Sequence, residues 1–206
     1  MARPRLITDE QILTTMRSCV LEHGAQVSLD VVAQQLGVTS PALLKRFGSR
    51  QALMLEALRP PEDPAFIARF LEGPDERPLR AQLTDRFDEV WAFFEEIIPC
   101  ITALRESGIE HSKIFDGKNK NPLRALQAIA RWLEQAHARG LADVPSPDSV
   151  ATAILGALQT RAFTAHVGNI KFSARSTRAY LDDLVELFCR ALAVKGRRPS
   201  QRTEVA

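Results

Sequence analysis

Hydrophobic residues recur through most of the chain at intervals of three and four, the spacing that places them on one face of an α-helix. Glycine and proline separate these periodic segments from one another. No segment shows the strict alternation of apolar and polar residues that indicates a half-buried β-strand. The pattern therefore predicts an all-α protein of about nine helices.

The stretch from Ser28 to Phe47, SLDVVAQQLGVTSPALLKRF, reads as two short helices joined by a tight turn. Ser28 and Thr39 can each cap a helix, because their side-chain oxygens can accept from the free backbone N–H groups of its first turn. Gly37 follows the last periodic residue of the first helix, where a left-handed residue commonly ends a helix. This pattern is typical of a DNA-binding helix-turn-helix, and an ordinary helical hairpin in a core is the alternative.

The outer face of the second short helix is expected to carry short side chains followed by a pair of cations. Short side chains permit close approach to base edges, and cations suit the phosphates of DNA. The residues expected on or near this face are Ser40, Pro41, Ala42, Leu44, Lys45 and Arg46. The composition of this face favours the DNA-binding interpretation.

Prolines at positions 60, 61 and 64 interrupt the helical pattern, and we place a domain boundary there. We expect an N-terminal three-helix helix-turn-helix domain over residues 1–59 and a helical bundle over residues 60–195. Thr8 and Gln11 predict a capping box at the start of the first helix. Residues 196–206 are expected to form a disordered basic tail.

The longest periodic segment covers residues 78–107. Pro99 lies inside it and is expected to kink or split the helix, because proline lacks an N–H group and clashes with the preceding turn. Residues 108–121 are polar, contain two glycines and read as a loop. Three further helices are expected over residues 122–139, 147–167 and 176–194.

Charge is distributed unevenly along a chain of 206 residues whose net charge is only +2. Residues 1–59 hold seven Lys and Arg against five Asp and Glu, residues 60–194 hold sixteen against nineteen, and residues 195–206 hold four against one. Basic ends and a mildly acidic middle suit a small DNA-contacting unit attached to a neutral body.

The three cysteines, Cys19, Cys100 and Cys189, are far apart and odd in number, which argues against a disulfide framework. No Cys/His spacing of a zinc site is present, so no metal and no cofactor is expected. The N-terminus has no apolar signal-peptide core, and no apolar run approaches the length of a membrane span. We therefore expect a soluble, cytoplasmic protein.

The segment from Ile12 to Leu58 resembles the DNA-binding region of the tetracycline-repressor (TetR) family of transcriptional regulators. The residues that carry the resemblance are Gly24, Ser28, Val32, Ala33, Leu36, Gly37, Val38, Leu43, Phe47, Ser49, Arg50, Ala52 and Leu53. Family members commonly have an aromatic pair and a histidine just before the residue equivalent to Phe47, whereas this chain has Leu44, Lys45 and Arg46. Beyond residue 60 the resemblance is only architectural.

The resemblance implies a homodimer that binds a palindromic operator and is released by a small-molecule effector. The residues that it implies as phosphate contacts are Ser28, Thr39, Lys45, Arg46 and Arg50, and those that it implies at base edges are Ser40, Pro41 and Ala42. Lys45 can alternatively reach a guanine. Arg3 and Arg5 either follow the DNA or belong to a disordered tail.

Two copies of the last two helices are implied as the dimer interface. The interface candidates are Ala153, Gly156, Ala157, Thr160, Leu181, Leu184, Val185 and Phe188, for which burial in the chain's own core is the alternative. An effector pocket is expected among the helices over 78–107, 122–139 and 147–167. Its candidate lining residues are Phe87, Trp91, Phe94, Ile98, Cys100, Gln127, Arg131, Trp132, Gln159 and Phe163, and core packing is again the alternative.

Three other functions stay open at this point. Cys100 beside Pro99 suggests an oxidant sensor. A DNA-binding regulator that senses no ligand is the second. Glu134 and His137 form the helical Glu-x-x-His unit of di-iron bundles, but the chain has no second such unit, so a metal-dependent enzyme is the remote alternative.

Overall fold

The structure is a computed structural model that describes residues 7–115 and 121–194. Arg3, Arg5 and the tail over 196–206 lie outside the described residues. Within these ranges the protein contains ten helices and no strand, which confirms the all-α prediction. The helices are α1 (Asp9–His23), α2 (Leu29–Leu36), α3 (Ser40–Phe47), α4 (Arg50–Leu58), α5 (Ala65–Leu71), α6 (Leu79–Glu106), α7 (His111–Ile114), α8 (Asn121–Ala138), α9 (Pro147–Val167) and α10 (Ala174–Ala191).

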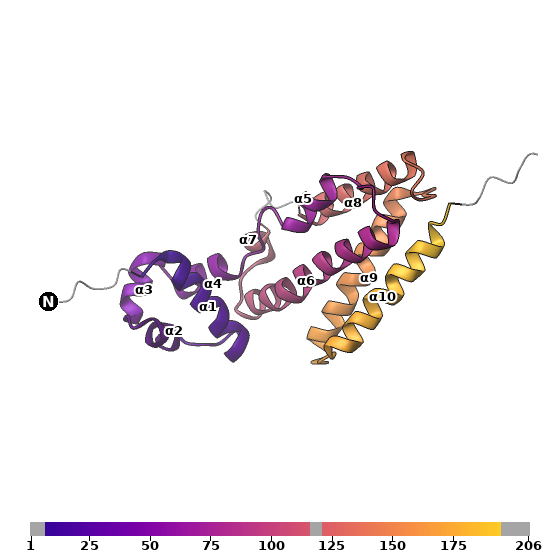
Figure 1. Cartoon of the computed structure of the whole chain (residues 1–206). Helices are drawn as coiled ribbons and strands as arrows, with labels where there is room; N and C mark the ends of the chain where they lie inside the picture. Colours follow the sequence, from indigo (N-terminus) through magenta and orange to yellow (C-terminus); the bar gives the residue numbers. More distant parts are fainter. Residues whose placement is uncertain (1–6, 116–120, 195–206) are drawn as a thin grey trace, which may run out of the picture.

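The first four helices form a small unit at one end of an elongated molecule (Figure 1). The predicted capping box starts α1: the Thr8 side chain accepts from the Gln11 N–H at 3.2 Å, and the Gln11 side chain accepts from the Thr8 N–H at 3.0 Å. The helix ends at Gly24, whose φ of 87° is a conformation that favours glycine. Helix α1 then packs against both α2 and α4, so it holds the unit together.

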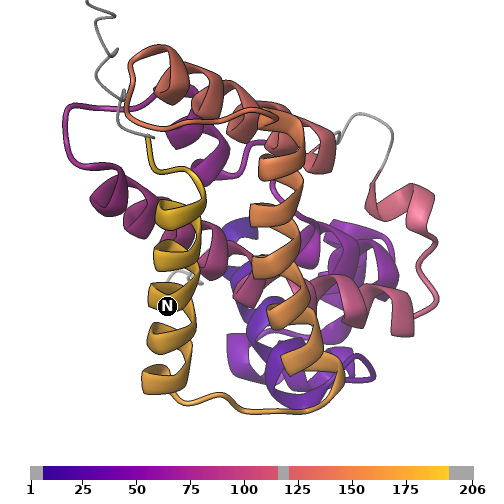
Figure 2. The same ribbon diagram turned by 90° about the vertical axis from the view of Figure 1, so that its right-hand side faces the viewer.

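The remaining helices form the body, in which the long helix α6 contacts α4, α5, α9 and α10. Helices α9 and α10 run in opposite directions along one side of the body and are joined by a loop at one end (Figure 2). Aromatic pairs mark the core: Phe87 of α6 meets Phe188 of α10 edge-to-face at 5.7 Å, and Phe70 of α5 meets Trp132 of α8 at 6.1 Å. The core therefore extends across all the long helices of the body.

Two local predictions differ from the structure. Helix α6 runs without interruption through Pro99, so the proline does not split it. The missing N–H leaves the Glu95 carbonyl without its helical donor, and Glu95 and Pro99 both border an open hollow beside α9. The short helix α7 lies inside the predicted polar loop, where its buried residue Ile114 anchors the segment to the core.

Across the described residues, none of the helices combines the length and the apolar character that a membrane span requires.

Candidate DNA-binding surface and ligand cavity

The α2–α3 pair has the local structure that its sequence predicts. The Ser28 side chain accepts from the Val31 N–H and the Thr39 side chain accepts from the Ala42 N–H, each at 3.4 Å, so both predicted caps are present. Gly37 adopts a left-handed conformation with a φ of 68° and turns the chain between the helices. These local hydrogen bonds define where each helix begins, and the Gly37 turn places α3 directly after α2.

Helix α3 buries one side and exposes the other. Leu43 is the buried residue of this helix, whereas Pro41, Ala42, Leu44 and Lys45 are exposed. Ser40 lies at the N-terminus of the same helix, where its hydroxyl donates to the carboxylate of Asp30 in α2. This surface can therefore approach a second molecule with short side chains at its N-terminal end and a cation further along.

The cations of this region differ in their partners. Arg46 is exposed but bonded within the chain: its Nη1 donates to the Ile7 carbonyl at 2.7 Å and its Nη2 pairs with Asp9. Lys45 is exposed, and it forms no ion pair with residues 7–115 or 121–194. Of these two cations, only Lys45 has an ammonium or guanidinium group without an intramolecular partner in the described chain.

Arg50 at the start of α4 is half-buried, and its guanidinium reaches back to the loop between α1 and α2. Its Nε donates to the Val27 carbonyl at 2.9 Å and its Nη2 to the Ala25 carbonyl at 2.5 Å. A guanidinium can make such a forked contact because its donors lie in one plane. In this structure the side chain predicted to hold phosphate thus joins α4 to the α1–α2 loop.

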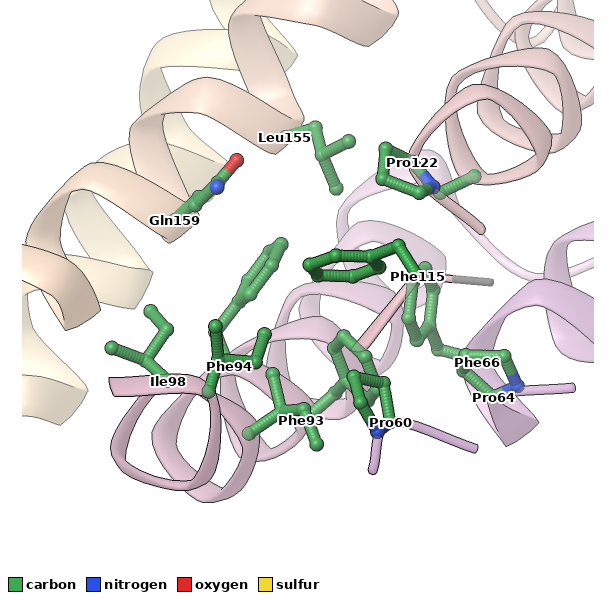
Figure 3. Close-up of a pocket in the computed structure, with 13 residues that line it drawn as sticks. Pro60, Pro64, Phe66, Phe93, Phe94, Ile98, Phe115, Pro122, Leu155 and Gln159 are labelled. Carbon is green, nitrogen blue, oxygen red and sulfur yellow. The ribbon is translucent and has the colours of Figure 1, made fainter. Parts of the chain in front are cut away.

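A cavity of about 120 Å³ lies in the body, next to the segment that follows α4 (Figure 3). Its walls come from α5, α6, α8, α9 and the turns around them. The lining residues are Pro60, Pro64, Phe66, Phe93, Phe94, Ile97, Ile98, Ile101, Phe115, Pro122, Ala125, Leu155 and Gln159. Gln159 is the sole polar side chain among them, and none of them carries a charge.

Aromatic rings form much of this wall. Phe66 of α5 lies against Phe93 of α6 with ring centroids 5.0 Å apart, and Phe93 lies 5.4 Å from Phe94. The ring of Phe115 projects between these residues and Leu155 of α9 (Figure 3). Such tilted arrangements are favourable for aromatic pairs because the edge of one ring meets the face of another.

Three of the predicted pocket residues, Phe94, Ile98 and Gln159, line this cavity. Trp91 lines the separate hollow beside Pro99, while Phe87 and Trp132 are fully buried in the core contacts described above. The remaining predicted pocket residues lie elsewhere: Cys100 is buried in α6, Gln127 and Arg131 are exposed on α8, and Phe163 is exposed on α9. The body therefore has a cavity, but most of the predicted side chains do not line it.

The sequence interpretation missed Pro60, Pro64, Phe66, Phe93 and Phe115 as cavity residues. Pro60 and Pro64 were interpreted only as breaks in the helical pattern, but their apolar rings also form part of the cavity wall. Phe93 lies next to Phe94 in sequence, and the sequence interpretation assigned only Phe94 to the inward face of its helix. Only the packing of α5 and the segment after α7 against α6 brings these residues together.

The predicted interface residues divide into two groups. The residues of α10, which are Leu181, Leu184, Val185 and Phe188, are buried in this single chain, because α10 packs against α6. On α9, Ala153 and Thr160 are exposed and Gly156 and Ala157 are half-buried. Gly156, Ala157 and Thr160 border a hollow of about 450 Å³ between α9 and α10.

Large apolar side chains are exposed on the same two helices. The exposed fractions are 51% for Phe163, 62% for Val167 and 58% for Leu187. Arg161 sits at the side of the hollow between Phe172 and Tyr180, with its guanidinium carbon 3.9 and 4.2 Å from their ring centroids. This face therefore combines protruding apolar groups with a recess.

The thiols are in environments that favour their neutral form. Burial raises the pKa of Cys100, whose Sγ donates to the Glu96 carbonyl at 3.3 Å, and burial likewise raises the pKa of Cys19 and Cys189. A raised pKa lowers the thiolate fraction that an oxidant attacks. The surroundings of Cys100 therefore disfavour the oxidant-sensor alternative.

The Glu-x-x-His unit of α8 also has a structural explanation. His137 Nδ1 accepts from the Val144 N–H at 3.1 Å, which ties the end of α8 to the following loop. Within the described ranges, no group of three or more His, Cys, Asp or Glu is arranged to hold a metal ion.

A profile of the C-terminal domain of AefR-like transcriptional repressors matches residues 117–194 of this chain. The whole fold is similar to that of a TetR-family transcriptional regulator from Mesorhizobium loti, with a TM-score of 0.64 at 16% identity over 89% of this chain and 95% of that chain. The fold of this chain is therefore that of TetR-family transcriptional regulators.

Other solved structures extend the similarity in fold. NemR of E. coli in its reduced form gives a TM-score of 0.63 at 16% identity, over 92% of this chain and all of that chain. FadR of Bacillus subtilis in complex with stearoyl-CoA gives 0.61 at 14% identity, over 93% of this chain and all of that chain. A comparison with curated protein sequences gave no match.

Proposed function

We propose that this protein is a member of the TetR family and a ligand-responsive transcriptional repressor of the cytoplasm. It binds a palindromic operator as a homodimer through α3, and a small molecule in the cavity of the body releases it. The observation that carries the proposal is the position of the cavity: Pro60 and Pro64, which lie in the segment between α4 and α5, form part of its wall. A ligand there contacts the segment that leads from the DNA-binding unit into the body.

The DNA-binding part of the proposal is supported by the exposed surface of α3. Ser40, Pro41 and Ala42 would face base edges, and Lys45 would contact a phosphate or a guanine. Ser28 and Thr39 lie at the N-termini of their helices, where backbone N–H groups favour anions. The arrangement gives sequence readout at one end of α3 and charge at the other.

The dimer is supported by the face formed by α9 and α10. A partner's protruding side chains, such as Phe163 and Leu187, would fill the recess around Gly156 and Thr160. Burying exposed apolar area is the main favourable term in association. A symmetric pair would also present two copies of α3 to two half-sites of DNA.

The proposed mechanism is a shift between two conformations. In one conformation the two α3 helices of the dimer are wrongly spaced for the operator. A ligand that prefers this conformation weakens operator binding by an amount set by the difference between its affinities for the two conformations. One solved structure with this fold, FadR, is a complex with stearoyl-CoA, which supports ligand binding as a use of the fold. The identity of the ligand here follows from the cavity's own side chains.

The test is the salt dependence of DNA binding by the full-length protein and by Lys45→Ala. A duplex is first selected from a random-sequence library, and affinity is then measured by fluorescence anisotropy. We expect Lys45→Ala to weaken binding and to reduce the slope of log K against log salt by about 1 per half-site. Lys171→Ala, which removes the same charge from the α9–α10 loop, is the matched control and should leave the slope unchanged.

Two results would contradict the proposal. Selection of no duplex by the wild-type protein would remove the DNA-binding function. Identical slopes for Lys45→Ala and Lys171→Ala would remove α3 as the contacting helix.

A further inference from the structure

The ligand cavity of the proposed function has side-chain chemistry that restricts what can enter it. Twelve of its thirteen lining residues are apolar, and four of these are phenylalanines. The remaining residue is Gln159 of α9, which lies across the cavity from Phe94 and Ile98 of α6 (Figure 3). The inference below rests on the proposed function for its biological meaning and on these walls for its chemistry.

The volume of the cavity limits the size of the ligand. An apolar cavity of about 150 Å³ lined by leucine, isoleucine and phenylalanine stays dry and binds benzene. The cavity in this protein measures about 120 Å³ and has walls of similar composition. It therefore suits a single six-membered ring with a small substituent.

The absence of charge on the thirteen lining side chains limits the charge of the ligand. A carboxylate or an ammonium group that leaves water without a partner loses several kcal/mol of hydration free energy. Phenylalanine faces attract cations, but only modestly compared with that loss unless several rings form a cage. An uncharged ligand avoids the cost altogether.

Gln159 supplies the one polar contact. Gln159 is exposed to solvent, and its side-chain amide offers two N–H donors and a carbonyl acceptor that form no hydrogen bond with residues 7–115 or 121–194. A ligand hydroxyl or carbonyl placed beside it would gain a hydrogen bond, while the ring of the ligand packs among Phe66, Phe93 and Phe115. The amide would thereby orient the ligand within an otherwise apolar space.

We propose that the effector is a small uncharged aromatic compound that carries one hydroxyl or carbonyl group, and that Gln159 recognises this group. Benzyl alcohol has this chemistry and serves as the probe. Toluene lacks the polar group, and benzoate and benzylammonium replace it with a negative and a positive charge.

The test measures the affinity of the four probes for the full-length protein by calorimetry and by ligand-induced thermal stabilisation. Toluene and benzyl alcohol should bind, and both ions should bind at least tenfold more weakly. Gln159→Leu should lower the affinity for benzyl alcohol relative to toluene by about fivefold, the value of one ordinary hydrogen bond. Gln127→Leu makes the same change on the exposed side of α8 and should leave this ratio unchanged.

A second variant tests the location independently of Gln159. Leu155→Phe adds volume inside the cavity, so both neutral probes should bind it at least tenfold more weakly than the wild type. Unchanged binding of the probes to Leu155→Phe would overturn the proposed location. Circular dichroism of each variant confirms that it is folded.

The remaining outcomes separate this inference from the proposed function. Tighter binding of either ion than of the neutral pair, or binding of none of the four probes, would overturn the inference. An unchanged affinity ratio in Gln159→Leu would overturn the role of the amide. If the neutral probes bind as expected but do not release the selected duplex, the ligand class stands and the effector role in the proposed function fails.

Discussion

Arg17 in α1 and Glu96 in α6 form an ion pair that joins the DNA-binding unit to the body. The same guanidinium donates from Nε to the Ala57 carbonyl near the end of α4 at 2.9 Å. Glu96 immediately precedes Ile97, which lines the ligand cavity. Arg17 therefore contacts both α4 and α6. A ligand-induced movement would have to pass from α6 to α4 to reach the N-terminal unit.

A change at Glu96 is expected to alter the coupling between ligand and DNA. Glu96→Gln removes the charge that Arg17 pairs with, but exposed ion pairs contribute only about 0–1 kcal/mol to stability. We expect little change in the free energy of unfolding and a loss of about 0.5–2 kcal/mol of coupling free energy. The measurement is the ratio of operator affinities with and without benzyl alcohol.

The control for this prediction is the neighbouring residue. Glu95→Gln makes the same substitution on the side of α6 that faces the hollow by Pro99, away from Arg17. Equal coupling ratios for the two variants would show that the ion pair does not transmit the ligand's effect.

Arg50 is expected to matter for stability more than for DNA binding. Arg50→Ala leaves the Val27 carbonyl without its donor and the Ala25 carbonyl with the Ser107 hydroxyl as its remaining donor, which should lower the free energy of unfolding by roughly 1–3 kcal/mol. The salt dependence of DNA binding should stay as in the wild type, in contrast to Lys45→Ala. Urea denaturation at one fixed protein concentration gives the first quantity, and anisotropy titrations give the second.

Arg131→Ala provides the reference for Arg50→Ala, because Arg131 is exposed on α8 and a surface substitution there should change stability by less than about 0.5 kcal/mol. A shallower salt slope for Arg50→Ala with unchanged stability would instead support the phosphate contact that the family resemblance implies.

The thiols are expected to react slowly with a disulfide reagent in the folded protein. Cys19 and Cys100 are buried and Cys189 is half-buried, and burial raises the pKa of all three. The raised pKa reduces the thiolate fraction near neutral pH, so the rate should rise with pH and reach its midpoint above that of a free thiol. Absorbance with an aromatic disulfide measures the rate, and Cys189→Ser should remove the fastest phase.

Rapid reaction of Cys100 at neutral pH would contradict this expectation and would restore the oxidant-sensor alternative. The Cys100→Ser variant identifies the phase of the reaction that comes from Cys100, because this variant keeps Cys189.

The sequence predicted the local features of the fold well because they depend on neighbouring residues. Thr8, Ser28, Thr39 and Ser49 each cap the helix that follows them, and in each case the bonded N–H lies three residues away. Gly37 ends α2 for an equally local reason, its left-handed conformation. These contacts are formed within one turn of helix, so their residue spacing is visible in the sequence.

The ligand cavity could not be predicted in the same way. Phe66, Phe93 and Phe115 belong to three segments, and only the tertiary packing of those segments brings their rings together. In α9, apolar residues occur on all sides, so periodicity did not distinguish the buried Leu158 from the exposed Phe163. The partners of Arg46, which are the Ile7 carbonyl and the Asp9 carboxylate, and the backbone partners of Arg50 are likewise distant in sequence, and no local pattern indicates them.

The two prolines in the cavity wall have a consequence for how such a regulator can change its ligand. Pro60 and Pro64 belong both to the binding site and to the connection with the DNA-binding unit, so altering them would change recognition and response together. Leu155 and Gln159 line the same space from α9, outside that connection, whereas Arg124 ties α8 to the connection through an ion pair with Asp63. New ligand preferences are therefore most readily acquired from the α9 side, by evolution or in the design of a biosensor, while the connection to the N-terminal unit is left intact.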